Sequence, residues 1–231
     1  MADHGFSALT LKSVSVRNPS ALTDSLKEKR CQIARQVASL FSEGKEVFFI
    51  NETSWSNGTR RRKGRAPRGQ RAFSYQTSLR FSLTAITAIS TTGQKYSHLL
   101  WGSVSADVFV SFIRQFLGHR ADGRQMSPIV LYMDNASIHS DEALQQLCAQ
   151  TGHILIMGPE YTPEMNPIEL LFGFWKGRTR TLLGAGLHLD RDVYMRAIQE
   201  AFQTITEDQI RASVNHVFYE VYPKVYRRED I

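Results

Sequence analysis

Alternation between apolar and polar residues along the chain predicts a succession of helices and short strands. Apolar residues three and four positions apart predict a helix over 21–43, which Gly44 is placed to end. The run VFFI is apolar and partly β-branched, which predicts a buried strand over 46–51. Alternating residues predict a long strand over 79–90, and 95–102 follows a TTGQ turn as its hairpin partner.

The rest of the chain predicts helices and strands in turn. Thr206 and Gln209 form a capping-box pattern at the start of the last helix. The resulting order is helix, three strands, helix, strand, helix, strand and further helices. It resembles the order of the ribonuclease-H-like fold, an α/β architecture with a mixed five-stranded sheet flanked by helices. The remaining expected elements are helices over 105–118 and 140–150, strands over 127–135 and 153–158, and helices that start near Pro167 and cover 189–203 and 206–219.

Composition narrows the class of protein. With 231 residues and 42% hydrophobic content, the chain is long and apolar enough for one large globular domain. No apolar run approaches the roughly 18 residues that a membrane-spanning helix needs, so no membrane partner is expected. The two cysteines, Cys31 and Cys148, are far apart and form no CxxC pattern. We therefore expect neither a disulfide framework nor a structural zinc site.

Polar side chains stand where predicted strands and helices begin or end. Asn51 and Glu52 follow the apolar run of the first strand, and Asp134 follows the apolar strand SPIVLYM. Glu169 lies at the start of the helix near Pro167, and the intervening residues 135–168 number 34. In α/β proteins the carboxyl ends of central strands are where chemistry tends to be placed.

These segments resemble the catalytic domain of mariner-superfamily cut-and-paste DNA transposases, in the branch with Asp, Asp and then Glu 34 residues on. The matching pieces are FFINETSW, GRAPRGQR, MDNASIH and YTPEMNPIELLFGFWK, within residues 10–180. The resemblance implies that the catalytic, metal-binding positions are Asn51, Asp134 and Glu169. It also implies two Mg²⁺ ions per site, for which Mn²⁺ substitutes. Carboxylate oxygens suit such ions, which activate the attacking oxygen and stabilise the leaving one in displacement at phosphorus.

Asn51 departs from this pattern, because the family has Asp there. An amide oxygen is a weaker ligand and neutralises no charge, and strand alternation points Glu52 to the other face. We therefore expect poor metal binding and impaired cleavage. An engineered replacement and a natural change both fit, and the intact remainder of the motif favours the former.

The resemblance implies an enzyme that cleaves transposon ends and joins the 3′-hydroxyl to target DNA. Its partners would be double-stranded DNA and, in the DNA complex, a second copy of the chain. The location would be the nucleus in a eukaryote, or otherwise the cytoplasm with DNA. The alternative is a non-catalytic, transposase-derived DNA-binding or assembly protein, which Asn51 favours and the intact Asp134 and Glu169 oppose.

Positive charge is concentrated in one segment. The chain carries a net charge of +6, and residues 59–71 hold seven basic and no acidic residues. Three interpretations fit: a solvated charge run, a nuclear-targeting tract, or an element that contacts DNA or the partner subunit. The resemblance favours the last, as a clamp-like loop inserted after the first strand. The residues concerned are Arg60, Arg61, Arg62, Lys63, Arg65, Arg68 and Arg71.

The expected organisation follows from these assignments. Residues 1–20 are interpreted as the remnant of a linker from N-terminal DNA-binding modules that family members carry. The catalytic domain would cover 21–231, with the basic loop over 56–73 and C-terminal helices over 181–231.

Several site residues also have a purely structural interpretation. Glu169 would occupy position N3 of a helix capped by Asn166, where a carboxylate is favourable anyway. Asp134 alone would suit a turn after a strand. Asn135 and His139 are candidates for contacts that hold the site in order, although a structural histidine fits as well. Trp175 and Phe172 fall at helical spacing and are expected in the core.

Overall fold

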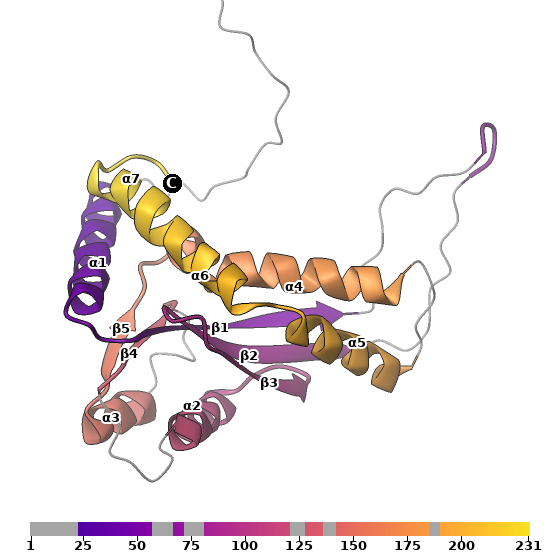
Figure 1. The fold of residues 1–231 in the computed structure, drawn as a ribbon, viewed down its shortest axis with the longest axis horizontal. Helices are drawn as coiled ribbons and strands as arrows, with labels where there is room; N and C mark the ends of the chain where they lie inside the picture. Colours follow the sequence, from indigo (N-terminus) through magenta and orange to yellow (C-terminus); the bar gives the residue numbers. More distant parts are fainter. Residues whose placement is uncertain (1–22, 57–66, 72–80, 121–127, 136–141, 185–189) are drawn as a thin grey trace, which may run out of the picture.

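A computed structural model describes residues 23–56, 67–71, 81–120, 128–135, 142–184 and 190–231. These form one five-stranded mixed sheet in the order β3-β2-β1-β4-β5, with helices on both faces (Figure 1). The predicted ribonuclease-H-like architecture is confirmed. The strands are β1 (Val47–Ser56), β2 (Ser82–Ser90), β3 (Lys95–Trp101), β4 (Val130–Met133) and β5 (Ile154–Met157).

Sheet topology follows from the connections. β1 pairs antiparallel with β2, and a short turn joins β2 to its antiparallel partner β3. After helical crossovers, β4 pairs parallel with β1 and β5 pairs parallel with β4. The helices are α1 (Asp24–Ser42), α2 (Ala106–Arg120), α3 (Glu142–Thr151), α4 (Ile168–Leu183), α5 (Arg191–Gln203), α6 (Glu207–His216) and α7 (Tyr222–Tyr226), with short irregular turns η2 (Pro163–Met165) and η3 (Val217–Val221).

The sheet separates two apolar cores. Phe49, Trp55 and Tyr132 face helices α1 and α4 to α7, whereas Phe48 and Ile50 face α2 and α3. Figure 1 shows α4, α5 and α6 on one side of the sheet and α2 and α3 on the other. Trp175 and Phe172 lie buried in the first core, as predicted, and the rings of Trp175 and Trp55 meet edge to face at 4.6 Å between centroids.

Helix ends mostly match the expected signals. Gly44 follows α1 with a φ of 81°, which suits glycine, and donates its N–H to Phe41. Thr206 and Gln209 make both bonds of the capping box. The last helix, expected to end at 219, instead continues through η3 into α7. Pro223 has no N–H to donate, and a π-helical turn precedes it.

The first strand is longer than predicted. We expected it to end at Asn51, whereas β1 continues to Ser56. The reason lies in its two neighbours: the parallel pairing with β4 stops at Ile50 and Met133, but the antiparallel pairing with β2 continues to Ser56 and Ser82. Asn51 therefore stands mid-strand, at the point where one neighbour leaves. None of the helices in the described ranges is long and apolar enough to cross a membrane.

Candidate active site

Strand register brings the first two candidate residues together. Ile50 and Met133 are direct partners in the parallel pair of β1 and β4, and Asn51 and Asp134 are the next residues of their chains. Neighbouring strands lie about 4.8 Å apart. Two residues earlier, Phe49 and Tyr132 share a face, with ring centroids 5.3 Å apart. Period-two alternation therefore carries Asn51 and Asp134 to that same face, and it turns Glu52 toward the other, as predicted.

Helix α4 supplies the third candidate. Glu169 lies in its first turn, close to where β1 passes beneath the helix. The assigned helix begins at Ile168, one residue later than expected, but Pro167 already has helical angles. The side-chain oxygen of Asn166 accepts the N–H of Ile168 at 3.3 Å, so Asn166 does act as a capping residue.

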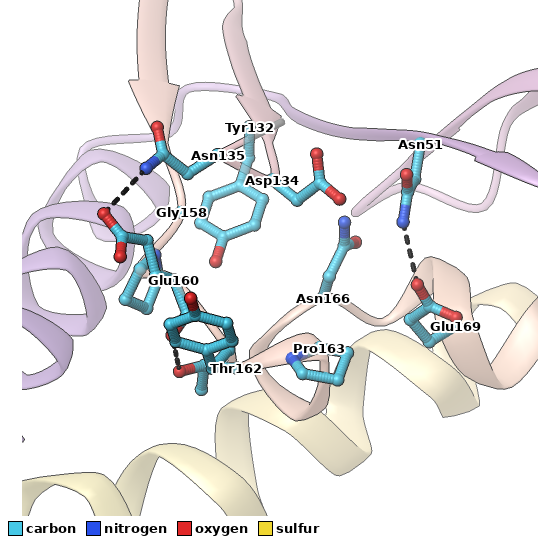
Figure 2. A pocket seen from close by; sticks show the side chains of 12 residues that line it. Asn51, Tyr132, Asp134, Asn135, Gly158, Glu160, Thr162, Pro163, Asn166 and Glu169 are labelled. Atoms are coloured by element: carbon cyan, nitrogen blue, oxygen red, sulfur yellow. Dashed lines mark hydrogen bonds between the residues drawn. The ribbon is translucent and has the colours of Figure 1, made fainter. Parts of the chain in front are cut away.

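Asn51 and Glu169 are in direct contact. The Nδ2 of Asn51 donates a hydrogen bond to Oε1 of Glu169 at 2.8 Å, and Figure 2 shows this bond across the end of the cleft. The Oδ1 of Asn51 accepts the backbone N–H of Glu52, also at 2.8 Å. Asn51 is only 6% exposed, and these two bonds fix which way its amide points.

The surroundings of Glu169 disfavour its charged form. Burial of the carboxyl group is the largest cause that raises its pKa, and the negative charge of Asp134 adds to it. Lys176 and the hydrogen bond from Asn51 act in the opposite direction. Glu169 as a whole is solvent-exposed by surface area, while its carboxyl group is turned into the cleft against Asn51.

A cleft of about 510 Å³ opens beside these residues. Asn51 and Glu169 stand at one end, Asp134 and Asn166 in the middle, and Asn135 with Glu160 at the other end (Figure 2). Its remaining lining residues are Tyr132, Gly158, Pro159, Tyr161, Thr162 and Pro163. Sequence reasoning did not single out these six as site residues, although Tyr161, Thr162 and Pro163 belong to the YTPEMNPIELLFGFWK segment.

The other predicted site residues divide into described and undescribed positions. Asn135 lines the cleft and donates to Glu160 at 3.2 Å, at the end away from Asn51. Arg68 and Arg71 are exposed around a turn in which the N–H of Gln70 bonds the carbonyl of Pro67. His139 and the basic residues Arg60, Arg61, Arg62, Lys63 and Arg65 lie outside the described residues, as does the segment 1–20.

The donor atoms fit a metal site only in part. Asp134 and Glu169 offer the carboxylate oxygens that Mg²⁺ and Mn²⁺ prefer. Asn51 does not fit in the arrangement present, because its amide nitrogen faces Glu169 and its oxygen faces its own strand. Within the described ranges, no three His, Cys, Asp or Glu side chains converge as a metal-binding group.

Comparison with family models decides the family. The model of the DDE superfamily endonucleases matches residues 46–183, more than half of the chain. The chain belongs to this family. The matched range contains Asn51, Asp134, Glu169 and every strand of the sheet. A comparison with curated proteins finds no match for this DDE-family domain.

Solved structures support the fold of this DDE-family domain. The Mos1 mariner paired-end complex with Mn gives a TM-score of 0.74 at 14% identity, covering 94% of this chain and 66% of the Mos1 chain. The Mos1 strand transfer complex gives 0.72 at 15%, covering 96% and 67%. The Mos1 catalytic domain gives 0.69 at 12%, covering 94% of this chain and all of that one. The chain thus spans about two thirds of the longer Mos1 chains, and identity this low shows the shared fold alone.

Proposed function

We propose that this chain is the catalytic domain of a DDE-type DNA transposase in which Asn51 impairs the metal site. The observation that carries the proposal is the convergence of Asn51, Asp134 and Glu169 at one cleft on a ribonuclease-H-like sheet. The similarity to structures of Mos1 with transposon ends, and with Mn or Mg, supports DNA and divalent metal as partners.

Each residue has a distinct part in the proposed chemistry. When bound, a pair of divalent ions supplies activation of the attacking oxygen and stabilisation of the leaving oxygen in phosphodiester hydrolysis and strand transfer. Asp134 and Glu169 would hold the ions through carboxylate oxygens. Asn51 contributes no negative charge and directs an N–H toward Glu169, so it opposes the assembly of that set. We therefore expect weak metal binding and little cleavage by this chain.

A Mn²⁺ titration by calorimetry tests this proposal. We would compare the parent, Asn51→Asp, and Asn51→Asp combined with Asp134→Ala. We expect the single substitution to bind Mn²⁺ at least about tenfold more tightly than the parent, which corresponds to about 1.4 kcal/mol. The double variant should lose this gain, because Asp134 completes the same site. Equal affinities in all three proteins would mean that the three positions do not form one site.

One observation favours a second candidate, a non-catalytic DNA-binding or assembly protein derived from such a transposase. The hydrogen bond from Asn51 satisfies Glu169 without any metal, which suits a chain retained for binding alone. Restoration of metal-dependent DNA cleavage by Asn51→Asp would support a disabled enzyme. If the restored carboxylate binds Mn²⁺ but no DNA is cut, the binding protein becomes the better description.

The basic residues are proposed to contact DNA or the partner subunit in either case. Replacing Arg60, Arg61 and Arg62 by Ala removes three positive charges, so fewer counterions are released on binding. We expect weaker DNA binding and a shallower dependence on salt. An unchanged salt slope would assign this segment to targeting or to a solvated surface.

A further inference from the structure

Asn166 places a buried, unused hydrogen-bond donor in the cleft. It is 3% exposed and lies between η2 and α4. Its Oδ1 accepts the N–H of Ile168, and a backbone N–H is only ever a donor. The atom that faces the helix must therefore be the oxygen, and the opposite end of the amide is the NH₂ group.

This NH₂ group has no hydrogen-bond partner within the part of the chain that the structure describes. Among the described residues, three buried side-chain polar atoms share this property: Trp55 Nε1, Asn166 Nδ2 and Tyr222 Oη. Only Asn166 also lines the cleft. Buried donors are almost always paired, and an unpaired one at a site suggests that a ligand supplies the acceptor.

The position of the donor indicates what that acceptor is. Figure 2 shows the nitrogen of Asn166 turned up into the middle of the cleft, between Asp134 on one side and Asn51 with Glu169 on the other. The Oε1 atom of Glu169 already accepts from Asn51. An NH₂ donor suits an anionic oxygen such as a non-bridging oxygen of a phosphodiester. Divalent ions held by Asp134 and Glu169, as the proposed function requires, would offset the repulsion between this oxygen and the two carboxylates.

We propose that the side-chain amide of Asn166 donates a hydrogen bond to a non-bridging oxygen of the DNA phosphate bound in the cleft. Asn166 is then a substrate-binding residue, which orients the phosphate relative to Asp134 and Glu169, and the same side chain fixes the start of α4. This inference rests on the proposed function, since it requires DNA phosphate at the metal site.

Variants at this position separate the two roles. Asn166→Ser keeps a hydroxyl that can cap Ile168, because serine is a favoured capping residue, but its shorter side chain presents no donor to the middle of the cleft. Asn166→Ala removes both functions. Both are made in the full chain that also carries Asn51→Asp, so that the metal site is complete. If the Asn166→Ser protein does not fold, Asn166→Asp takes its place. Aspartate has the same shape and keeps the capping oxygen, but it lacks the NH₂ donor.

The measured quantity is the gain in DNA affinity on adding Mn²⁺. The probe is a short fluorescein-labelled DNA duplex of arbitrary sequence, followed by anisotropy with and without Mn²⁺, with its integrity checked on a gel. We expect Asn166→Ser to keep the urea midpoint and the Mn²⁺ affinity of its parent, yet to lose about tenfold or more of the Mn²⁺-dependent DNA affinity. Asn166→Ala should lose a similar factor and also unfold more readily.

Each other outcome has a definite meaning. If Asn166→Ser binds DNA as its parent does, the donor serves a fixed water and the inference is wrong. It is also wrong if Mn²⁺ affinity without DNA falls by the same factor, because the donor would then serve the metal's own water. Asp134→Ala in the same background tests the proposed function separately. If that variant keeps the Mn²⁺-dependent gain, the metal site is misassigned whatever Asn166 does.

Discussion

Replacing Asn51 by Asp reverses the sign of its contact with Glu169. The parent side chain donates an N–H to Oε1 of Glu169 at 2.8 Å. After Asn51→Asp, two carboxylates face each other at this distance, with a third at Asp134 nearby. We expect the metal-free variant to be less stable than the parent at pH 7, and to recover stability when a divalent cation binds.

The size of the loss is bounded from two directions. Two charges about 4 Å apart repel by about 1 kcal/mol in water and about 4 kcal/mol near a protein surface, and the exposure of Glu169 favours the lower half of this range. A lost charge-assisted hydrogen bond adds about 1.5–3 kcal/mol. The loss of stability cannot exceed about 4 kcal/mol at pH 7, because one of the two carboxyls can bind a proton and so remove the repulsion. Binding that proton costs about 1.4 kcal/mol for each pH unit above an ordinary pKa near 4.3. We therefore expect a loss of about 2–4 kcal/mol.

Because protonation limits it, the loss of stability caused by Asn51→Asp should depend on pH. The shared proton makes the folded-state pKa of the pair higher than the unfolded value. Proton binding by this carboxyl pair therefore contributes fully to the free energy of unfolding at pH values below the unfolded-state pKa. That contribution is lost as the pH rises through the folded-state pKa. At pH 5 the upper limit on the loss falls to about 1 kcal/mol. The gap between variant and parent should accordingly shrink from pH 7 to pH 5 in EDTA.

Urea unfolding in EDTA and in Mn²⁺ measures both effects. At a Mn²⁺ concentration about 100 times the dissociation constant, binding adds about 2.7 kcal/mol, which returns the variant close to the parent. Combining Asn51→Asp with Glu169→Gln is the matched control, since the amide and carboxylate merely exchange places and metal-free stability should be restored. Equal stability of parent and single variant in EDTA at both pH values would refute the contact on which this reasoning rests.

Four further predictions concern packing and burial. Gly158→Ala should cost about 1–3 kcal/mol by urea unfolding, because its Cβ would lie 2.7 Å from Tyr132 Oη and 3.1 Å from the carbonyl of Met133. Gly173→Ala, on the open side of α4, should instead add about 0.5–1 kcal/mol. Burial raises the pKa of the Cys148 thiol from 9.0 to about 11. Its contribution to stability is therefore complete below pH 9 and lost as the pH rises toward 11, and native alkylation near pH 8 should be far slower than in urea. Lys95→Met should cost about 1–3 kcal/mol by the same unfolding assay, because Nζ bonds the carbonyls of Phe202 and Ile205, each at 2.6 Å, at the end of α5.

Sequence patterns predicted the sheet and the candidate site where local signals are strong. The apolar run before Asn51 and the one before Asp134 are both buried strands, because neither has a polar face to turn to solvent. Spacing and motif placed Glu169 at the start of a helix over the sheet. The parallel register of β1 and β4, which makes Asn51 and Asp134 neighbours, comes from long-range pairing that no local pattern encodes.

The extent of β1 and the role of Asn166 were beyond such patterns. After Ile50 the face of β1 that carries Glu52, Ser54 and Ser56 is partly or fully exposed, although β2 continues to pair with the strand. Polar residues on this one face therefore resemble the end of a strand. Asn166 was recognised as a capping residue, but a cap accounts only for its oxygen. Its unpaired nitrogen becomes visible only when the cleft is assembled from β1, β4 and α4.

In the proposed metal site, we expect Asn51 to lower metal affinity by more than the loss of a charge. To offer its oxygen to a cation, the amide must rotate and give up its bonds to Glu169 and to the N–H of Glu52. Rotation would also leave Glu169 without the donor that now offsets its burial. The same bonds hold the metal-free site in a closed, satisfied arrangement. A divalent cation would therefore have to displace the Asn51 amide, whose N–H already bonds Oε1 of Glu169. Glu52 cannot assist because the strand turns it to the opposite face.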